Sequence, residues 1–222
     1  MKKFTKYLGF VLILFFLSTY SSKNSNNKDS YFFPIKIINI ENNKIEDKEK
    51  IKNELNYLLG KNLLLLNQST IKSSFKKFDF VSDYQIKKVY PQTLKIIIQE
   101  KKPVAIYLSG KDKFYISNKG ELIKFKYLEH LKELPLVFGK NLNFMELYNV
   151  LKVINFPIYK IKSFHYFNIG RWDIDLKNKK TIKLPTKNYK NILKEFKILM
   201  NNKNFDKYQI FDYRIKDQVI LN

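Results

Sequence analysis

A run of apolar residues close to the N-terminus constrains this chain more than any other feature. The run covers residues 7–20 and follows three lysines. A helix over residues 4–22 would be about 28 Å long, just enough to cross a hydrocarbon core of about 30 Å if Lys6 extends toward the headgroups. We therefore predict a single membrane anchor within residues 1–22, with a cytoplasmic N-terminus and the remainder of the chain outside.

A cleavable signal peptide is the competing interpretation, because the apolar run is short. The best small-x-small cleavage site, Thr19-Tyr20-Ser21, is weak, so an uncleaved anchor is favoured. The following residues 23–32 are rich in Ser, Asn, Lys and Asp and are predicted to form a linker. The chain has no cysteine, which excludes disulfides, thiolate metal sites and lipoprotein attachment, so any exported part is held together by packing.

The net charge of +22 comes almost entirely from lysine, and lysines occur along the whole chain. Abundant Asn, Ile, Phe and Tyr accompany them, which indicates a general compositional bias. Nucleic-acid binders instead concentrate Arg and aromatic residues on one surface, so no nucleic-acid partner is expected. Arginine occurs only at positions 171 and 214, where its planar, two-pronged geometry has a specific use.

Residues 33–102 show the pattern of a small α+β module. A strand is predicted over residues 35–40, then a helix capped by Asp47 and ending at Gly60, then a helix capped by Asn67. Two alternating strands follow, on either side of a turn at Pro91. The predicted order is β-α-α-β-β.

Residues 103–222 are predicted to form a mainly antiparallel β domain with flanking helices. A hairpin is expected around residues 118–120, where Asn and Gly tolerate positive φ. Helices are expected near residues 144–151 and 189–200, because apolar residues recur there at helical spacing. The other strands expected are 158–167, 172–176, 181–184, 208–214 and 218–221.

The sequence gives little support for catalysis, so we expect neither an enzyme nor a cofactor or metal site. Only two histidines are present, far apart in sequence. Two Ser-x-x-Lys matches, beginning at Ser73 and Ser74, lack the Ser-Asp-Asn and Lys-Thr-Gly companion motifs of penicillin-binding and β-lactamase enzymes. Asp173 and Asp175 alternate on a predicted strand and are expected to be solvated, and no Gly-rich phosphate loop is found.

One stretch, residues 81–107, resembles the end of the POTRA module in the FtsQ/DivIB family of cell-division proteins. It carries a Pro-x-Thr-Leu turn from Pro91, alternating aliphatic residues, and then Glu100 and a Pro-Val-Ala segment from Pro103. Further matches follow in the family's order: the hairpin over 113–123, the Leu-Pro-x-x-x-Gly segment ending at Gly139, the Trp172 strand, and the Asp-x-Arg segment Asp212-Tyr213-Arg214.

The resemblance implies a non-catalytic scaffold of the bacterial division machinery. It implies partners similar to the small bitopic proteins FtsB and FtsL, together with other membrane proteins of the divisome. It also implies a single-pass protein of the inner membrane, largely periplasmic and concentrated at the septum. The alternative is a POTRA-containing component of an envelope transport or secretion assembly, although no long series of barrel strands follows the module.

The expected partner-binding site lies near the C-terminus, where a final apolar strand has no later strand to cover its edge. Such an edge can accept a partner's strand, with side chains beside it providing selection. The expected site residues are Arg171, Trp172, Asp212, Arg214, Gln218, Val219, Ile220 and Leu221. After Asp-x-Arg this chain departs from the family pattern, because Ile215-Lys216-Asp217 replaces an aromatic residue and a glycine. Core packing for Trp172 and a junction ion pair for Glu100 are the structural alternatives.

Overall fold

The computed structural model describes residues 11–15, 32–140 and 143–222. Residues 11–15 are helical, and no helix in these three ranges is long and apolar enough to cross a membrane. The predicted anchor therefore lies outside the described residues except for this one short segment. The predicted linker also lies outside them, except for Phe32.

The α+β class predicted from the sequence is confirmed, with two sheets and few helices. The elements up to the junction between the sheets are β1 (Ile37–Glu41), α2 (Lys48–Leu55), η1 (Asn56–Leu58), η2 (Gln68–Ile71), α3 (Lys72–Phe75), β2 (Val81–Val89) and β3 (Thr93–Glu100). Beyond the junction follow β4 (Pro103–Ser109), β5 (Asp112–Ser117), β6 (Leu122–Lys124), η3 (Glu129–Leu131), β7 (Leu136–Phe138), α4 (Phe144–Val153), η4 (Ile158–Lys160), β8 (Ile161–Phe167), β9 (Arg171–Leu176), β10 (Thr181–Lys183), α5 (Tyr189–Leu199), η5 (Lys203–Phe205), β11 (Ile210–Asp212) and β12 (Ile220–Leu221).

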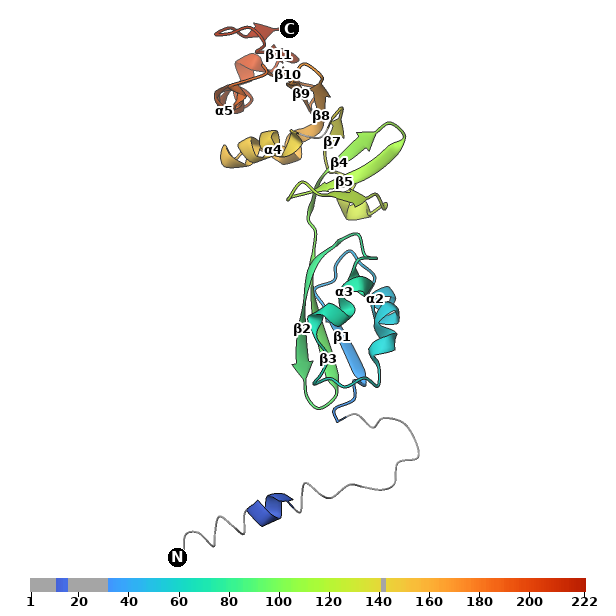
Figure 1. Ribbon diagram of the computed structural model, residues 1–222. Coiled ribbons are helices and arrows are strands. Elements are labelled where there is room, and N and C mark those ends of the chain that lie inside the picture. The colour runs from blue at the N-terminus through green and yellow to red at the C-terminus, as the bar shows by residue number, and fades with distance from the viewer. Residues whose placement is uncertain (1–10, 16–31, 141–142) are drawn as a thin grey trace, which may run out of the picture.

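The first sheet has the order β1-β3-β2, with β1 parallel and β2 antiparallel to the central β3. Helices α2 and α3 cover one face of this sheet (Figure 1). Alternate residues of β1 and β3 are buried. The buried residues of this core include Ile38, Ile40, Ile51, Leu55, Leu58, Leu94, Ile96 and Ile98. The alternating apolar residues of the strands and the helically spaced apolar residues of α2 therefore pack together in one core.

Both helix starts in this sheet's unit use the caps expected from the sequence. The Asp47 carboxylate accepts the backbone N–H of Glu49 at 2.8 Å, and the Asn67 side-chain oxygen accepts that of Thr70 at 3.1 Å. Each cap satisfies a donor that the first helical turn leaves unpaired. After α2 and η1, Gly60 adopts a φ of +82°, which a side chain would disfavour.

The second sheet has nine strands in the order β12-β11-β10-β9-β8-β7-β4-β5-β6. Five of its eight strand pairs are antiparallel, and three, β10–β11, β4–β7 and β7–β8, are parallel. Helices α4 and α5 lie on the same side of this curved sheet (Figure 1). Their side chains, including Phe144, Leu151 and Phe196, pack with Phe164, Trp172 and Ile174 in a core of their own.

A third, smaller apolar cluster lies where the two sheets meet. Phe80, which precedes β2, is buried with Tyr115 of β5, Ile106 of β4 and Ile123 of β6. The Phe80 and Tyr115 ring centroids lie 5.9 Å apart. Glu100 lies close by, but among the described residues it does not form the junction ion pair considered from the sequence. Its carboxylate instead accepts the backbone N–H groups of residues 44–46 at 2.8–3.1 Å.

Candidate partner-binding site

The final strand, β12, is one edge of the nine-stranded sheet. It pairs antiparallel with β11 on one side, and the strand order ends there among the described residues. Val219 and Ile220 expose a large part of their side chains, whereas Leu221 packs partly against the core. Gln218 precedes the strand and donates its backbone N–H to the carbonyl of Ile215. The edge therefore combines backbone groups that pair with no further strand in the described part of the chain with exposed apolar side chains.

Asp212 and Arg214 form a two-pronged pair beside this edge. The Arg214 Nε lies 2.8 and 2.9 Å from the two Asp212 carboxylate oxygens, and Nη2 lies 2.5 Å from Oδ2. Asp212 is almost buried, while the Arg214 side chain is 43% exposed. The hydrogen bonds from Arg214 lower the pKa of Asp212, so this carboxylate stays charged and holds the guanidinium in place.

Arg171 makes the second arginine–aspartate contact on this sheet. Its guanidinium lies 4.4 Å from the centre of the Phe167 ring, and its Nε lies 3.2 Å from Asp173 Oδ1. Asp173 is buried, which corrects the expectation of a solvated residue. Burial raises the pKa of Asp173, and the nearby positive charges of Arg171, Lys183 and Arg214 oppose that rise.

Strand register explains why these charges come together. Asp173 of β9 pairs with Lys183 of β10, which pairs with Asp212 of β11, which pairs with Ile220 of β12. Directly paired residues point to the same face of a sheet, so opposite charges alternate in a row that ends at the edge strand. We call Arg171, Asp173, Lys183, Asp212 and Arg214 the charged row. The sequence pattern identified its two arginines and Asp212, but it missed Lys183 and the buried role of Asp173.

Trp172 does not belong to this surface. It is 3% exposed and packs edge-on against Phe144 and Phe164, with Tyr166 also in contact. Its neighbours Arg171 and Asp173 point to the opposite side, because successive residues of a strand alternate between faces. Trp172 therefore supports β9 from the helix-covered face, and its expected place among surface contacts is corrected to a core position.

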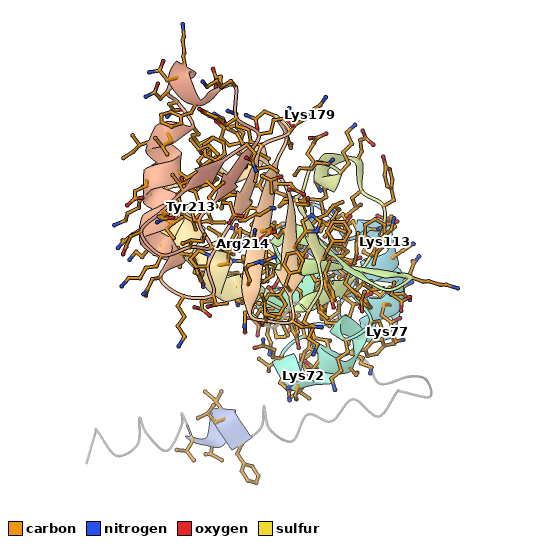
Figure 2. The ribbon with its side chains drawn as sticks, turned by 90° about the horizontal axis from the view of Figure 1, so that it is seen from above. Lys72, Lys77, Lys113, Lys179, Tyr213 and Arg214 are labelled. Carbon is orange, nitrogen blue, oxygen red and sulfur yellow. The ribbon has the colours of Figure 1, made fainter. Side chains whose placement is uncertain are left out.

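A groove of about 670 Å³ lies between the start of α5 and the segment leading to β12. Its lining includes Ile192, Glu195, Tyr213, Arg214 and Val219. The Tyr213 hydroxyl is buried and has no hydrogen-bond partner among the described residues. Burial, with a smaller contribution from Glu195, raises the pKa of Tyr213 to about 12. Figure 2 labels Tyr213 and Arg214 next to each other, with Lys113 on the far side of the view.

A polar cluster that the sequence reasoning missed lies on β8, β9 and β10. The His165 Nε2 atom lies 2.9 Å from Asp175 Oδ2 and 3.1 Å from Ser163 Oγ, and Thr181 donates to Asp175 at 2.8 Å. In a catalytic triad the serine and the aspartate contact different nitrogens of the histidine ring. Here both contact Nε2, so the arrangement is a hydrogen-bonded cluster without the geometry of a triad.

The Ser-x-x-Lys match of Ser74 with Lys77 also lacks catalytic geometry. The Ser74 hydroxyl lies 3.3 Å from the Tyr57 hydroxyl, while the Lys77 ammonium lies 2.6 Å from Glu54. Activation of a serine by a lysine requires contact between the serine hydroxyl and the lysine amino group, and here each of them contacts another residue. Within residues 11–15, 32–140 and 143–222 no group of three or more His, Cys, Asp or Glu side chains is arranged to hold a metal ion.

Comparisons with known proteins match both halves of the chain. Residues 33–101 match the model described as "POTRA domain, FtsQ-type", and residues 105–214 match "Cell division protein FtsQ/DivIB, C-terminal". The second match stops at Arg214, before the last strand. The chain is 28% identical to the cell division protein FtsQ of Rickettsia bellii over 193 residues, covering 85% of this chain and 72% of the relative. It is also 34% identical to the cell division protein DivIB of Clostridium tetani over 108 residues, covering 48% and 39% of the two chains. With two consecutive models matched in order, this chain belongs to the FtsQ/DivIB family of cell-division proteins.

Proposed function

We propose that the protein is a non-catalytic scaffold of the division machinery that binds FtsB- and FtsL-like bitopic proteins by strand addition at β12. Residues 1–22 would anchor it in the inner membrane, with residues 33–102 and 103–222 as two periplasmic units at the septum. The observation that carries this proposal is the free edge of β12 beside the charged row. Backbone groups of such an edge supply affinity for any extended segment, and the side chains beside it supply selection.

Charge at this edge favours a partner strand with an acidic residue. Asp212 binds the Nε and Nη2 atoms of Arg214, while Nη1 makes no hydrogen bond within the described residues. Nearly half of the Arg214 side chain is exposed. A carboxylate on an added strand would therefore meet a guanidinium that is already oriented, which lowers the entropic cost of binding.

The proposal is tested by capturing the full-length protein from membranes and identifying what comes with it. An FtsB- and FtsL-like pair in the capture supports the scaffold, while components of a secretion barrel would contradict it. Arg214→Ala should lower partner affinity roughly 10- to 100-fold, as loss of a central arginine at an interface commonly does. Lys113→Ala is the matched control, because Lys113 is an exposed cation at the other end of the same sheet, in β5. Equal affinity of the two variants would refute a role for the charged row.

A further inference from the structure

The end of the first unit that lies farthest from β4 is formed by three segments, residues 32–37, 57–66 and 87–92 (Figure 1). Backbone hydrogen bonds join them. The N–H of Ile35 donates to the carbonyl of Lys61, that of Leu63 to Phe33, and that of Lys36 to Gln92, each at 2.9 Å. These residues form one continuous surface, which we call the tip.

Large apolar side chains are exposed on the tip in unusual number. They are Phe32, Phe33, Ile37, Tyr57, Leu59, Leu64, Leu65, Val89 and Tyr90. Phe32 is 84% exposed and Leu65 74%. Single exposed apolar residues are ordinary on protein surfaces, but a contiguous group marks a surface that contacts something. The Phe33 and Tyr90 rings also meet edge to face at 5.1 Å, which links two of the segments.

The charge of the tip is purely positive. Its three segments contain Lys36, Lys61, Lys87 and Lys88 and no acidic residue. None of these four lysines forms an ion pair among the described residues, whereas other lysines of the unit pair with Glu41, Glu49 and Glu54. Lys88 donates from its ammonium group to the Leu64 carbonyl at 2.6 Å, and the Lys61 ammonium lies 4.9 Å from the centre of the Tyr57 ring. The tip therefore offers aromatic and aliphatic side chains together with ammonium groups that no carboxylate neutralises among the described residues.

The short distance along the chain between the tip and the predicted anchor indicates that the tip contacts the membrane. The predicted anchor ends by residue 22, and the ten residues from there to Phe32 can span at most about 35 Å. We propose that the tip is a membrane-contact surface that rests on the outer leaflet beside the anchor and binds anionic lipids there. Aromatic and leucine side chains enter the headgroup region and the four lysines contact lipid phosphates. This inference depends on the anchor in the proposed function.

Site-specific labelling tests the inference directly, because the chain contains no cysteine. Leu65→Cys and Tyr159→Cys place a fluorophore at two positions that are each 74% exposed, one on the tip and one in the second unit. The full-length chain is reconstituted in nanodiscs of phosphatidylcholine, with or without roughly one part in three of phosphatidylglycerol. A lipid carrying a quencher at its headgroup should quench the label at position 65 several-fold more than at position 159, and more strongly in the anionic discs.

The charge requirement is tested by replacing the four tip lysines with glutamine. Each lysine near an anionic surface contributes roughly fivefold to binding, so the change should reduce quenching at position 65 to the level of position 159. The control replaces Lys111, Lys113, Lys124 and Lys179, all exposed and all outside the tip, and should leave quenching unchanged.

Three outcomes would overturn the inference: equal quenching at the two positions, equal quenching in anionic and neutral discs, or no effect of the tip substitutions. The last two would indicate a protein partner or simple apolar adsorption at the tip. Retention of the chain in the discs, measured by size exclusion, reports on the anchor separately. A retained chain without quenching at position 65 would refute the tip and leave the anchored scaffold intact, whereas a chain that is not retained would remove the basis of both.

Discussion

The ring of Phe80 connects the two units, and its removal should uncouple them. Phe80 precedes β2 in the first unit, yet its side chain is buried against Tyr115 of the second unit, with Ile45 packed beside it. Its backbone is held independently, because its N–H donates to Glu46 at 3.1 Å and its carbonyl accepts from Lys101 at 2.7 Å. Phe80→Ala therefore deletes the apolar contact across the junction and keeps the local hydrogen bonds.

The expected size of the effect follows from the burial of the ring, which is almost complete. Truncating a buried phenylalanine to alanine costs about 3–5 kcal/mol. For a chain of this length a loss of about 3 kcal/mol lowers Tm by roughly 6–12 °C. Since the contact joins two units with separate cores, we expect more than a shift. We expect the parent to unfold in one transition and Phe80→Ala to unfold in two, measured by calorimetry of the detergent-solubilised full-length protein.

Phe75→Ala is the matched control. Phe75 is also buried, but it stacks on Tyr84 at 4.3 Å within the first core. This variant should lower the stability of the first unit through its own core, with the junction intact. If Phe80→Ala instead gives one transition shifted as far as that of Phe75→Ala, Phe80 is an ordinary core residue and the reasoning about coupling is wrong. An unchanged melting curve would be equally damaging.

Three further predictions test individual sites. Gly139→Ala should destabilise the protein by about 2 kcal/mol or more, since Gly139 has a φ of +89° and an added Cβ would lie 2.3 Å from the carbonyl oxygen of Tyr166. Gly110→Ala is the control, because Gly110 also has a positive φ but has open space around it. This variant should cost only about 1 kcal/mol, both costs being measured in denaturant titrations. The stability that Asp212 contributes is present above its ordinary pKa of 3.8 and is lost as the pH falls through its lowered folded pKa. The difference in unfolding free energy between the parent and Asp212→Asn, measured by chemical denaturation, should therefore shrink as the pH falls below 3.8. A constant difference would contradict the pairing of Asp212 with Arg214. Asp173 should behave oppositely, because burial raises its folded pKa. Its protonation should stabilise the folded state as the pH falls from neutrality toward 3.8. An Asp173→Asn variant that lacks this gain in stability on acidification would confirm that the folded pKa of Asp173 is raised.

Local signals made the first unit predictable. Asp47 and Asn67 cap helices through contacts within three residues in sequence, and the alternation in β2 and β3 reflects the single buried face of their sheet. These patterns act over short stretches of chain, so composition and spacing express them fully. The breaks at Gly60 and Pro91 are equally local.

The arrangement of the second sheet was less accessible. β7 enters between β4 and β8 by two parallel pairings, and β11 lies beside β10 although α5 separates them in sequence. Such choices depend on which distant strands bury the most apolar surface together, and no short segment records them. Two predicted strands were also too long: the strands expected over 208–214 and 218–221 are limited to Ile210–Asp212 and Ile220–Leu221.

The charged row shows the same limit at the level of a site. Asp212 and Arg214 are two residues apart, so their pairing could be expected from the sequence. Lys183 joins them only through the register of β10 with β9 and β11. The same register sets Lys183 beside the buried Asp173, whose contact with Arg171 lies within β9 itself. The two rare arginines marked this surface as a candidate from the sequence, whereas Lys183 could not be singled out because lysines occur along the whole chain.

The two proposed contact surfaces lie at opposite ends of the two folded units in Figure 1, the tip at the end of the first unit away from β4 and β12 at the far end of the nine-stranded sheet. A partner strand added at β12 would therefore be held away from the membrane on which the tip rests, at a height set by the two units and the junction between them. Phe80 and Glu100 would then act on function without contacting either ligand, because loosening the junction changes where β12 is presented. Phe80→Ala should accordingly leave the affinity for the isolated partner segment unchanged. It should weaken assembly with a full-length partner anchored in the same membrane, since only that assembly depends on the height and orientation of the β12 edge. Equal loss in both reactions would place the effect at the binding edge itself.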